Sequence, residues 1–390
     1  MPTIETIGTG CDYATPQAWY DAHAGDITSD PNAPYIGEME PEVFNSSLIM
    51  NTSVTDANHY FHLRAKSGYG FNGNIGGSYP LISGRIFSTF VTCSDDYTRF
   101  ENFVVGSKSL GDQYLGGVSV SACTGVVLDT IGVYDLSTTI VTSGGSIIGF
   151  NVGSMGAADN FVVIRNCVCC KLDLTAPLGT SVYVRGISMT GVGTIYCYNN
   201  AIHDLMCAGQ TTETVQGIHV STASSVFIIN NVVGTLTGDN LIGIYTNGNS
   251  AEDKRNNATM DNKGGTDSQD FIVPANEFAK ATDPYDFHMR FNGQCARNGV
   301  NLILGGYSYF PNRDCDRTFR VTTENWDIGI DFPYDSVFLI DPVLPESTSS
   351  ISFGSNILSK LDRTTNNLIA LNQRLLDRFD NKDYYKRKES

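Results

Sequence analysis

The sequence predicts an all-β fold, a right-handed parallel β-helix with a short N-terminal capping helix and a C-terminal amphipathic α-helix. Two observations lead to this fold class. Short strands recur along the chain, and glycine and asparagine mark the same places in successive copies. The chain also combines 39 glycines with only 17% charged residues, which is typical of many turns and short strands rather than long helices.

The first strand of each repeat starts at a glycine followed by alternating β-formers, as in Gly117 to Val120. Four further glycines follow at intervals of 32, 37, 31 and 26 residues, at Gly149, Gly186, Gly217 and Gly243. We expect these glycines at coil corners, because a Cβ atom there would crowd the neighbouring coil.

The second strand of the middle copies closes on an asparagine, at Asn166, Asn199 and Asn230. Asparagine tolerates the left-handed backbone conformation and hydrogen-bonds locally, so these residues are predicted to turn the other corner and to stack along the axis. Each strand is too short to be stable alone, and stacking buries its apolar side chains. A β-sandwich is the alternative fold, since it also spaces short strands regularly.

The composition limits the function. A net charge of −16 leaves no broad basic surface for phosphates, so nucleic acid is not expected as a partner. Neither a signal peptide nor an apolar run long enough to span a membrane is visible, so we expect synthesis in the cytoplasm. The ten cysteines should therefore be reduced and mostly buried. Their one cluster, Cys167 to Cys170, lacks zinc-site spacing, and no metal or cofactor is expected.

One short helix is expected to cap the N-terminal end, with Thr15 as its N-cap, Pro16 at its first position and a body up to Ala24. Its face of Ala18, Trp19 and Ala22 is predicted to plug the first coil, with Trp19 as the main plug. The chain then divides into a cap with the first coils, a repeat core, a loop-rich part whose residues 281–335 cover the far end, and a helical tail. These four parts span residues 1–100, 101–250, 251–345 and 346–390.

The tail carries a heptad-like stripe of apolar residues, with polar residues on its other faces. We expect this helix to dock the protein on a partner or to form a homo-oligomer, with a trimer favoured. The alternative is an amphipathic helix that packs on its own β-helix. The stripe consists of Ile357, Leu361, Leu368, Leu371, Leu375 and Phe379.

No catalytic residues are predicted. A glycosidase needs two carboxylates across a groove, and none of the candidate acids has a second acid at the same place in a neighbouring coil. Asp129 is instead assigned to the corner that Asn166 takes in the next copy. The candidate acids are Asp129, Asp135, Asp159, Asp204 and Asp239.

Other polar motifs are also interpreted as structural. The acidic pairs Asp95-Asp96 and Asp314-Cys315-Asp316 are predicted to be solvated turns rather than calcium ligands. The histidines have no nucleophile that the sequence places beside them. Tyrosines on outer faces could stack on sugars, although about half are expected to point into the core. These residues are His203, His219 and His288, and Tyr183, Tyr196, Tyr198 and Tyr245.

Several segments resemble β-helix proteins encoded by phages and by bacterial genomes. Residues Gly8 to Trp19 match their GTG-x-DYAT-x-x-AW opening. The chain departs from the family pattern at Phe71, where members often carry His, and at Ile330 to Phe332. The resemblance extends over about residues 7–332 and is specific for the fold rather than for an activity. Further similar stretches are His59 to Ala65, Gly68 to Gly73, Asp95 to Phe103, Asp286 to Met289 and Trp326 to Gly329.

Chains of this family are frequently virion structural proteins, so the resemblance implies a non-enzymatic component of a phage virion. It would be a head decoration, a fibre or a tail-spike component, with other capsid or tail proteins as partners. The β-helix would act as a rigid, protease-resistant scaffold, because stacked strands leave few free edges. The alternative function is a tail-spike that binds or cleaves a bacterial surface polysaccharide.

Overall fold

A computed structural model describes most of the chain up to residue 330. The described residues belong to one compact unit, Met1–Val337. The six apolar positions of the predicted docking helix lie outside them, as does Asp159. The described ranges are 2–83, 89–110, 114–139, 145–153, 155–157, 160–176, 182–191, 193–208, 214–221, 225–247, 251–290, 292–304, 306–309, 313–316 and 325–330.

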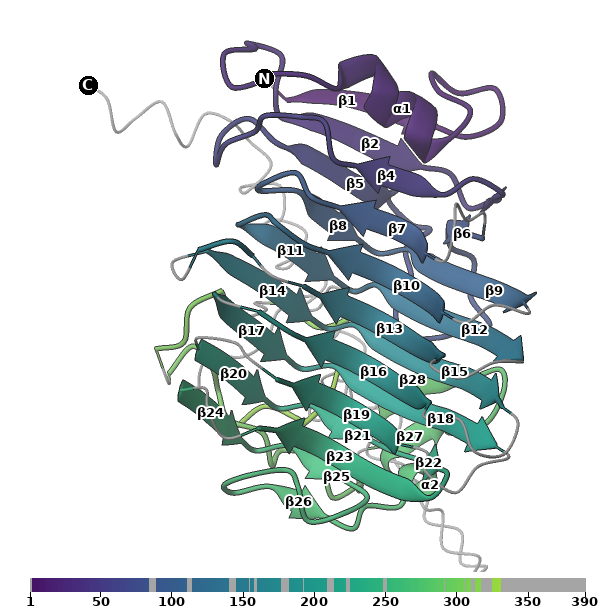
Figure 1. Ribbon diagram of the computed structural model, residues 1–390, viewed down its shortest axis with the longest axis vertical. Coiled ribbons are helices and arrows are strands. Elements are labelled where there is room, and N and C mark those ends of the chain that lie inside the picture. Colours follow the sequence, from purple (N-terminus) through teal and green to yellow (C-terminus); the bar gives the residue numbers. More distant parts are fainter. Residues whose placement is uncertain are drawn as a thin grey trace, which may run out of the picture. The chain divides into compact units, whose positions relative to one another are not determined.

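Three parallel sheets form a right-handed parallel β-helix (Figure 1), so the predicted fold class is confirmed. A typical coil gives one strand to each sheet in turn. The nine-stranded sheet contains β1 (Thr3–Ile7), β2 (Tyr35–Met39), β5 (Phe61–Ala65), β8 (Arg99–Glu101), β11 (Val126–Asp129), β14 (Phe161–Arg165), β17 (Thr194–Tyr198), β20 (Ser225–Ile229) and β24 (Ala251–Arg255).

The other two sheets complete each coil. The ten-stranded sheet contains β3 (Val43–Phe44), β6 (Leu81–Ile82), β9 (Val104–Leu110), β12 (Gly132–Thr139), β15 (Val168–Thr175), β18 (Ala201–Ala208), β21 (Val232–Val233), β22 (Leu236–Thr237), β25 (Ala258–Thr259) and β26 (Gln269–Asp270). The seven-stranded sheet contains β4 (Leu48–Met50), β7 (Thr89–Cys93), β10 (Tyr114–Val120), β13 (Ser146–Val152), β16 (Tyr183–Met189), β19 (Thr214–Val220) and β23 (Asn240–Thr246).

In-register pairing places apolar side chains above one another in the interior. Leu128, Ile164, Cys197 and Ile228 form one such column, with each residue paired to the next coil and buried. Burial of a side chain of this size contributes about 1.5–3 kcal/mol relative to exposure. A short strand that could not be stable alone is therefore held by the coils on both sides of it.

The recurring glycines lie within strands of the seven-stranded sheet, so their assignment to coil corners is wrong. Gly149, Gly186, Gly217 and Gly243 belong to β13, β16, β19 and β23. A Cβ atom on Gly186 would lie 2.5 Å from Ile202 Cγ2 and 2.7 Å from the Gly217 carbonyl oxygen. Glycine is needed because the backbone here passes very close to the next coil and to the ten-stranded sheet.

The repeated asparagines lie at the corner between the nine-stranded and ten-stranded sheets. Asn166, Asn199 and Asn230 adopt φ values of 53°, 55° and 60°, in the left-handed region. Thr130, with φ of 57°, occupies the same corner one coil earlier. Asp129 is the last residue of β11 and pairs with Arg165, so its assignment to the corner is wrong by one residue.

Axial stacking of asparagines occurs in the column that follows the corner. Asn200 Nδ2 donates to Asn231 Oδ1 at 2.9 Å, and Asn231 Nδ2 donates to Asn257 Oδ1 at 3.0 Å. The same two oxygens also accept the backbone N–H of Asn200 at 3.0 Å and of Asn231 at 2.9 Å. All three side chains are fully buried, and the ladder gives them hydrogen-bond partners without water.

The short helix α1 (Pro16–His23) lies at the N-terminal end of the solenoid (Figure 1), and Thr15 Oγ1 accepts the N–H of Ala18 at 3.1 Å. Trp19 is fully buried, and its ring packs edge-on against Phe61 at 5.7 Å. The buried face contains Pro16, Trp19 and Tyr20, whereas Ala18 and Ala22 are exposed. The predicted face was therefore wrong, because the i, i+3, i+4 stripe begins at the proline.

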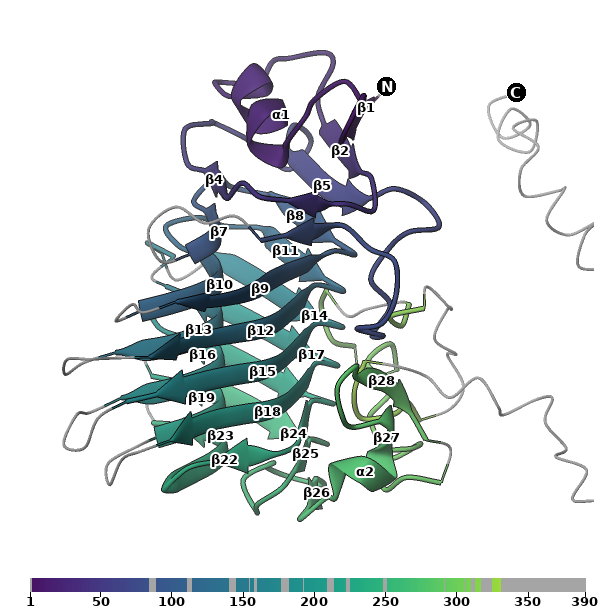
Figure 2. The ribbon, with the colours of Figure 1, turned by 90° about the vertical axis from the view of Figure 1, so that its right-hand side faces the viewer.

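The described residues of the segment 271–330, here called the arm, lie along the side of the solenoid (Figure 2). The arm contains α2 (Pro274–Glu277) and the antiparallel strands β27 (Phe278–Lys280) and β28 (Asp286–Met289). The Gly329 N–H donates to the Asn230 carbonyl at 2.7 Å. The expectation that residues 281–335 cover the far end is wrong for the described part of that segment.

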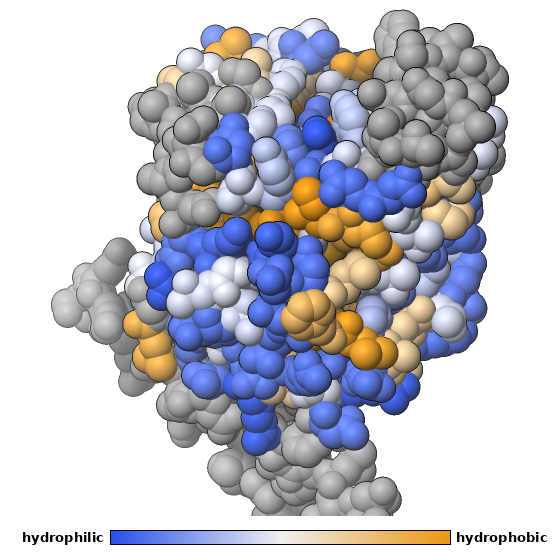
Figure 3. Space-filling view, turned by 60° about the horizontal axis from the view of Figure 1, so that its bottom comes forward, coloured by the Kyte–Doolittle hydropathy of each residue, from blue (hydrophilic) through white to orange (hydrophobic). Residues whose placement is uncertain are grey.

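The far end of the solenoid is closed by the last short strands and the polar turn between β25 and β26. Lys263, Asp267 and Asp270 are exposed in and beside this turn. Figure 3 shows this end with a largely hydrophilic surface that is broken by smaller hydrophobic patches. Polar covering of the last coil keeps its sheet edges from pairing with another chain.

The cysteines form no disulfide, and nine of the ten are buried while Cys11 is half-buried. Burial raises the pKa of thiols such as Cys169 well above the ordinary range. These side chains act as small apolar core residues. Among the described residues, no helix is long and apolar enough to cross a membrane.

We expect Gly117→Ala to lower the free energy of unfolding by about 1–3 kcal/mol, the usual cost of overpacking. A Cβ atom on Gly117 would lie 2.5 Å from the Gly149 carbonyl oxygen and 2.6 Å from Val133 Cγ1. Chemical denaturation measures the change. Gly116→Ala is the control, because a Cβ there meets only the side-chain ends of Thr89 and Tyr114, at 3.1 Å. Equal effects of the two substitutions would contradict the close-approach explanation.

Candidate functional site

A column of charged side chains runs along the outer face of the nine-stranded sheet. Glu38, Arg64, Glu101, Asp129 and Arg165 occupy one register position in β2, β5, β8, β11 and β14. Since adjacent strands lie about 4.8 Å apart, each of these side chains has the next as its nearest outward neighbour. These five residues are called the charged column below.

Ion pairs link neighbours in and beside the charged column. Arg64 Nε and Nη2 donate to Glu38 Oε1 at 3.1 and 2.6 Å, and Arg165 Nη2 lies 2.9 Å from Asp129 Oδ2. His62 Nε2 lies 2.7 Å from Glu101 Oε2. Ion pairs that remain partly exposed contribute only about 0.2–1 kcal/mol each to the free energy of unfolding. This small gain in stability does not by itself explain why the charged residues gather in one column.

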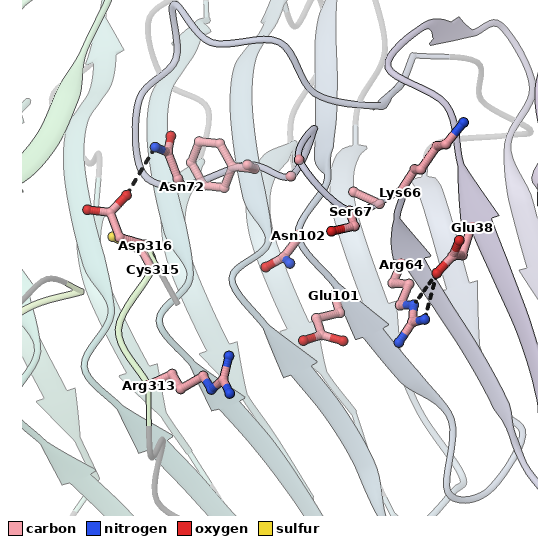
Figure 4. A pocket seen from close by; sticks show the side chains of 14 residues that line it. Glu38, Arg64, Lys66, Ser67, Asn72, Glu101, Asn102, Arg313, Cys315 and Asp316 are labelled. Carbon is pink, nitrogen blue, oxygen red and sulfur yellow. Dashed lines mark hydrogen bonds and ion pairs between the residues drawn. The ribbon is translucent and has the colours of Figure 1, made fainter. Parts of the chain in front are cut away.

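A cavity of about 540 Å³ opens over the upper half of the charged column. Its floor includes Glu38, Arg64 and Glu101, and Figure 4 shows Glu101 between Arg64 and Arg313. The loop of residues 66–72 forms one wall, and Arg313, Cys315 and Asp316 of the arm form another. The described charged residues that line it are three acids and three bases, namely Glu38, Glu101, Asp316, Arg64, Lys66 and Arg313.

The arm is anchored by the asparagines of the left-handed corner. Asn166 Nδ2 donates to the Arg313 carbonyl at 2.9 Å, and Asn199 Nδ2 donates to the Gly329 carbonyl at 3.0 Å. Asn230 makes two bonds to Val300, donating to its carbonyl and accepting its N–H, both at 2.8 Å. The corner therefore positions the arm residues that wall the cavity.

Aromatic side chains cover the same sheet face from β14, the last strand of the charged column, to β20. The Phe161 and Tyr309 rings stack at 4.4 Å, and the Tyr196 and Phe227 rings stack at 5.1 Å. Tyr309, which comes from the arm, is also 5.1 Å from Tyr196 and is 46% exposed. These four residues, called the aromatic platform below, offer flat apolar surface beside polar groups.

The sequence-based search for paired acids missed one pair. Asp129 and Glu101 lie opposite each other in β11 and β8, so the prediction that Asp129 has no acid in a neighbouring coil is wrong. Asp129 Oδ1 accepts from Thr130 and Asn166, at 3.0 and 3.2 Å. The pair was missed because Asp129 had been placed at the corner, one residue from its true register.

Two of the other candidate acids anchor the arm. Asp135, Lys171 and Asp204 bulge outward at the same place in successive coils, with φ values of 57°, 55° and 54°, respectively. Lys171 Nζ lies 3.1 Å from Asp135 and 2.8 Å from Asp283 of the arm, and its hydrogen bond holds the pKa of Asp283 below the ordinary value. Tyr285 of the arm donates to Asp204. The fifth candidate, Asp239, is exposed just before β23.

The four candidate tyrosines all lie on outer faces, so the expectation that about half point into the core is wrong. Tyr196 pairs in register with Val163 and Phe227, and Tyr198 lies two residues further along the same strand. Tyr198 is fully buried because Trp326 and Leu302 of the arm cover it. Tyr183 and Tyr245 lie on the seven-stranded sheet, beside a second cavity.

The second cavity, of about 460 Å³, lies on the outer face of β16, β19 and β23. The Arg185 guanidinium lies 4.0 Å from the centre of the Tyr183 ring and donates to Gln216 at 2.9 Å. His219 stacks on Tyr245 at 5.4 Å. Burial and the nearby Arg185 lower the pKa of His219 to about 4, so the imidazole is neutral at pH 7.

Of the acidic motifs predicted to be solvated turns, Asp95 and Asp314 are buried, whereas Asp316 is exposed. Asp95 accepts the Tyr20 hydroxyl at 2.6 Å. His203 is buried against the arm, with Nε2 3.1 Å from the Ala281 carbonyl. His288 lies 3.0 Å from Asp316, a contact between two motifs that the sequence displays but cannot place together.

No known protein family, curated protein or solved structure matches this chain. The resemblance to phage β-helix proteins therefore stays a prediction.

We expect Asn230→Gly to loosen the arm without unwinding the coil. Glycine keeps the left-handed corner but removes the two hydrogen bonds to Val300. Amide hydrogen exchange around Val300 should become about 5- to 150-fold faster, since two bonds contribute roughly 1–3 kcal/mol. Asn102→Gly is the control, because this corner has φ of 63° and the described contacts of its side chain include none to the arm. Unchanged exchange around Val300 would contradict the anchoring role.

Proposed function

We propose that this protein binds a bacterial surface polysaccharide along the outer face of the nine-stranded sheet. The observation that carries the proposal is the continuity of the charged column and the aromatic platform on one sheet face, beside a cavity of about 540 Å³. A sugar chain is an extended polymer with polar hydroxyl edges and apolar ring faces. A solenoid offers it polar and aromatic groups at a regular spacing of about 4.8 Å.

The balance of charge favours a glycan without strong net charge. Three acids and three bases line the cavity, and neighbouring members are paired, as Glu38 and Arg64 are. Such groups exchange hydrogen bonds with hydroxyls without a large electrostatic preference. A net charge of −16 opposes the approach of a polyanion.

The resemblance to phage proteins supports a place for this polysaccharide-binding β-helix in a virion, as a spike, fibre or decoration component. Segments that carry the resemblance meet at the cavity: β5, residues 68–73 and β8 contribute to its lining. Residues 346–390 are the proposed docking or trimerisation element, and they lie outside the described residues. Capsid or tail proteins would be the assembly partners.

We expect Tyr309→Ala to weaken binding of the cognate polysaccharide at least about tenfold, because it removes the exposed ring of the aromatic platform. Calorimetry or a glycan array of bacterial surface polysaccharides measures the affinity. Tyr245→Ala is the control, since Tyr245 is 37% exposed but belongs to the seven-stranded sheet. Equal affinities of the wild type and Tyr309→Ala would contradict the assignment of this sheet face as the binding face.

Cleavage is a second candidate function, because Glu38 and Glu101 line one cavity from the same register position, two coils apart. Two strand spacings separate their backbones by about 9.6 Å. Inverting glycosidases hold their two carboxyl groups roughly 6.5–9.5 Å apart, and glutamate side chains on strands at this spacing reach such a separation by leaning toward each other.

If the protein hydrolyses the glycan it binds, Glu38→Gln and Glu101→Gln should each lower the rate at least about 100-fold. Release of reducing ends measures the reaction, and retained binding by the same variants serves as the folding control. Asp239→Asn, in an exposed turn away from the cavity lining, should leave the rate unchanged. The absence of new reducing ends with a bound polysaccharide would restrict the function to binding.

A further inference from the structure

Three metal-ligating side chains of different chemistry meet where the arm contacts the loop of residues 66–74. His288 comes from β28, and Cys315 and Asp316 come from the segment that walls the cavity. One ligand atom from each residue lies within 4.8 Å of the other two. His288 Nε2 is 3.0 Å from Asp316 Oδ2. The cluster therefore joins one nitrogen, one sulfur and one oxygen donor from two distant parts of the arm.

Neighbouring groups orient two of these ligands. The Asp286 carboxylate hydrogen-bonds His288 Nδ1, which leaves Nε2 facing Asp316. Asn72 Nδ2 donates to Asp316 Oδ1 at 3.1 Å, which leaves Oδ2 for His288 or a cation. A carboxylate on the far nitrogen of a histidine is the arrangement that supports most metal-bound imidazoles.

We propose that His288, Cys315 and Asp316 bind a Zn²⁺ ion that joins β28 to the Arg313–Asp316 segment of the arm, beside the cavity. Histidine, thiolate and carboxylate together suit Zn²⁺, whereas Ca²⁺ and Mg²⁺ prefer oxygen ligands alone. Zinc bonds of about 2.0–2.3 Å place tetrahedral ligands roughly 3.3–3.8 Å apart. On binding, His288 Nε2 and Asp316 Oδ2, which are 3.0 Å apart, would separate slightly, and the wider separations of the cluster, up to 4.8 Å, would shorten. Cys315 and Asp316 line the cavity, so a water molecule from it can take the fourth position.

The sequence displays these donors separately, in Asp314-Cys315-Asp316 and at His288, but it does not predict the site because they are not spaced as a zinc motif. His288 and Cys315 are 27 residues apart in the chain, and Asn72 precedes Asp316 by 244 residues. Binding requires loss of the Cys315 proton and of any proton on His288 Nε2, so the affinity for Zn²⁺ should fall as the pH is lowered. The proposal is independent of polysaccharide binding, since it needs only the contacts of the arm.

The test uses the full chain, stripped with a chelator and titrated with Zn²⁺ and with Co²⁺. We expect one metal per chain, a higher melting temperature with Zn²⁺, and a thiolate-to-cobalt charge-transfer band from Cys315. Cys315→Ser should abolish that band, and His288→Gln should weaken Zn²⁺ binding at least 100-fold. Asp286→Asn, which keeps all three ligands, should weaken it about 10–100-fold.

Two control variants should bind Zn²⁺ like the wild type. Cys295→Ser alters another buried thiol of the arm, and His59→Gln alters another histidine paired with an aspartate. The cobalt spectrum of the wild type needs no variant, so the test does not depend on the folding of any substituted chain. Absence of a charge-transfer band, or equal Zn²⁺ affinity in the wild type, Cys315→Ser and His288→Gln, would overturn the proposal.

Discussion

The structure depends on one backbone constraint, the left-handed conformation at the corner between the nine-stranded and ten-stranded sheets. Asn166, Asn199 and Asn230 adopt it with φ near 55° and use their side-chain amides to bind the arm. One residue later, Asn200 and Asn231 turn inward and bond along the axis. Two adjacent columns thus set both the stacking of the coils and the position of the arm, because a coil that slipped would break both sets of bonds.

In-register stacking also explains how a surface site arises from residues far apart in the chain. Glu38, Arg64 and Glu101 are neighbours only because each occupies the same place in its own coil. The sheet face by itself would be open to solvent, and exposed ion pairs on it would contribute little. The arm changes this by adding Arg313 and Asp316 as a wall, so the N-terminal coils and the arm together make the cavity.

The fold could be predicted from the sequence because a repeat displays the same local requirement several times. The requirement itself was harder to identify. A recurring glycine indicates that a Cβ atom is excluded, but a close approach and a corner leave the same pattern, and Gly186 proved to be at a close approach. The Glu101 and Asp129 pair needed register accurate to one residue. The path of the arm and the His288 and Asp316 contact depend on long-range packing that no local pattern encodes.

The arm is held by a buried apolar cluster as well as by many weak polar bonds, and this bears on how firmly the cavity wall is fixed. Phe278 and Phe287 of the arm are fully buried in one cluster with solenoid residues such as Val168. A hydrogen bond such as that from Asn166 to Arg313 contributes about 0.5–1.5 kcal/mol, and an exposed pair such as Lys171 with Asp283 contributes no more. The buried Trp326 and Leu302 hold the middle of the arm more firmly, through contact with Tyr198. The segment from Arg313 to Asp316 lies beside the cavity, and Cys315 within it is buried in the larger apolar cluster. The polar contacts of the segment with Asn72, His288 and Asn166 add to this anchor and fix the residues that wall the cavity over the charged column.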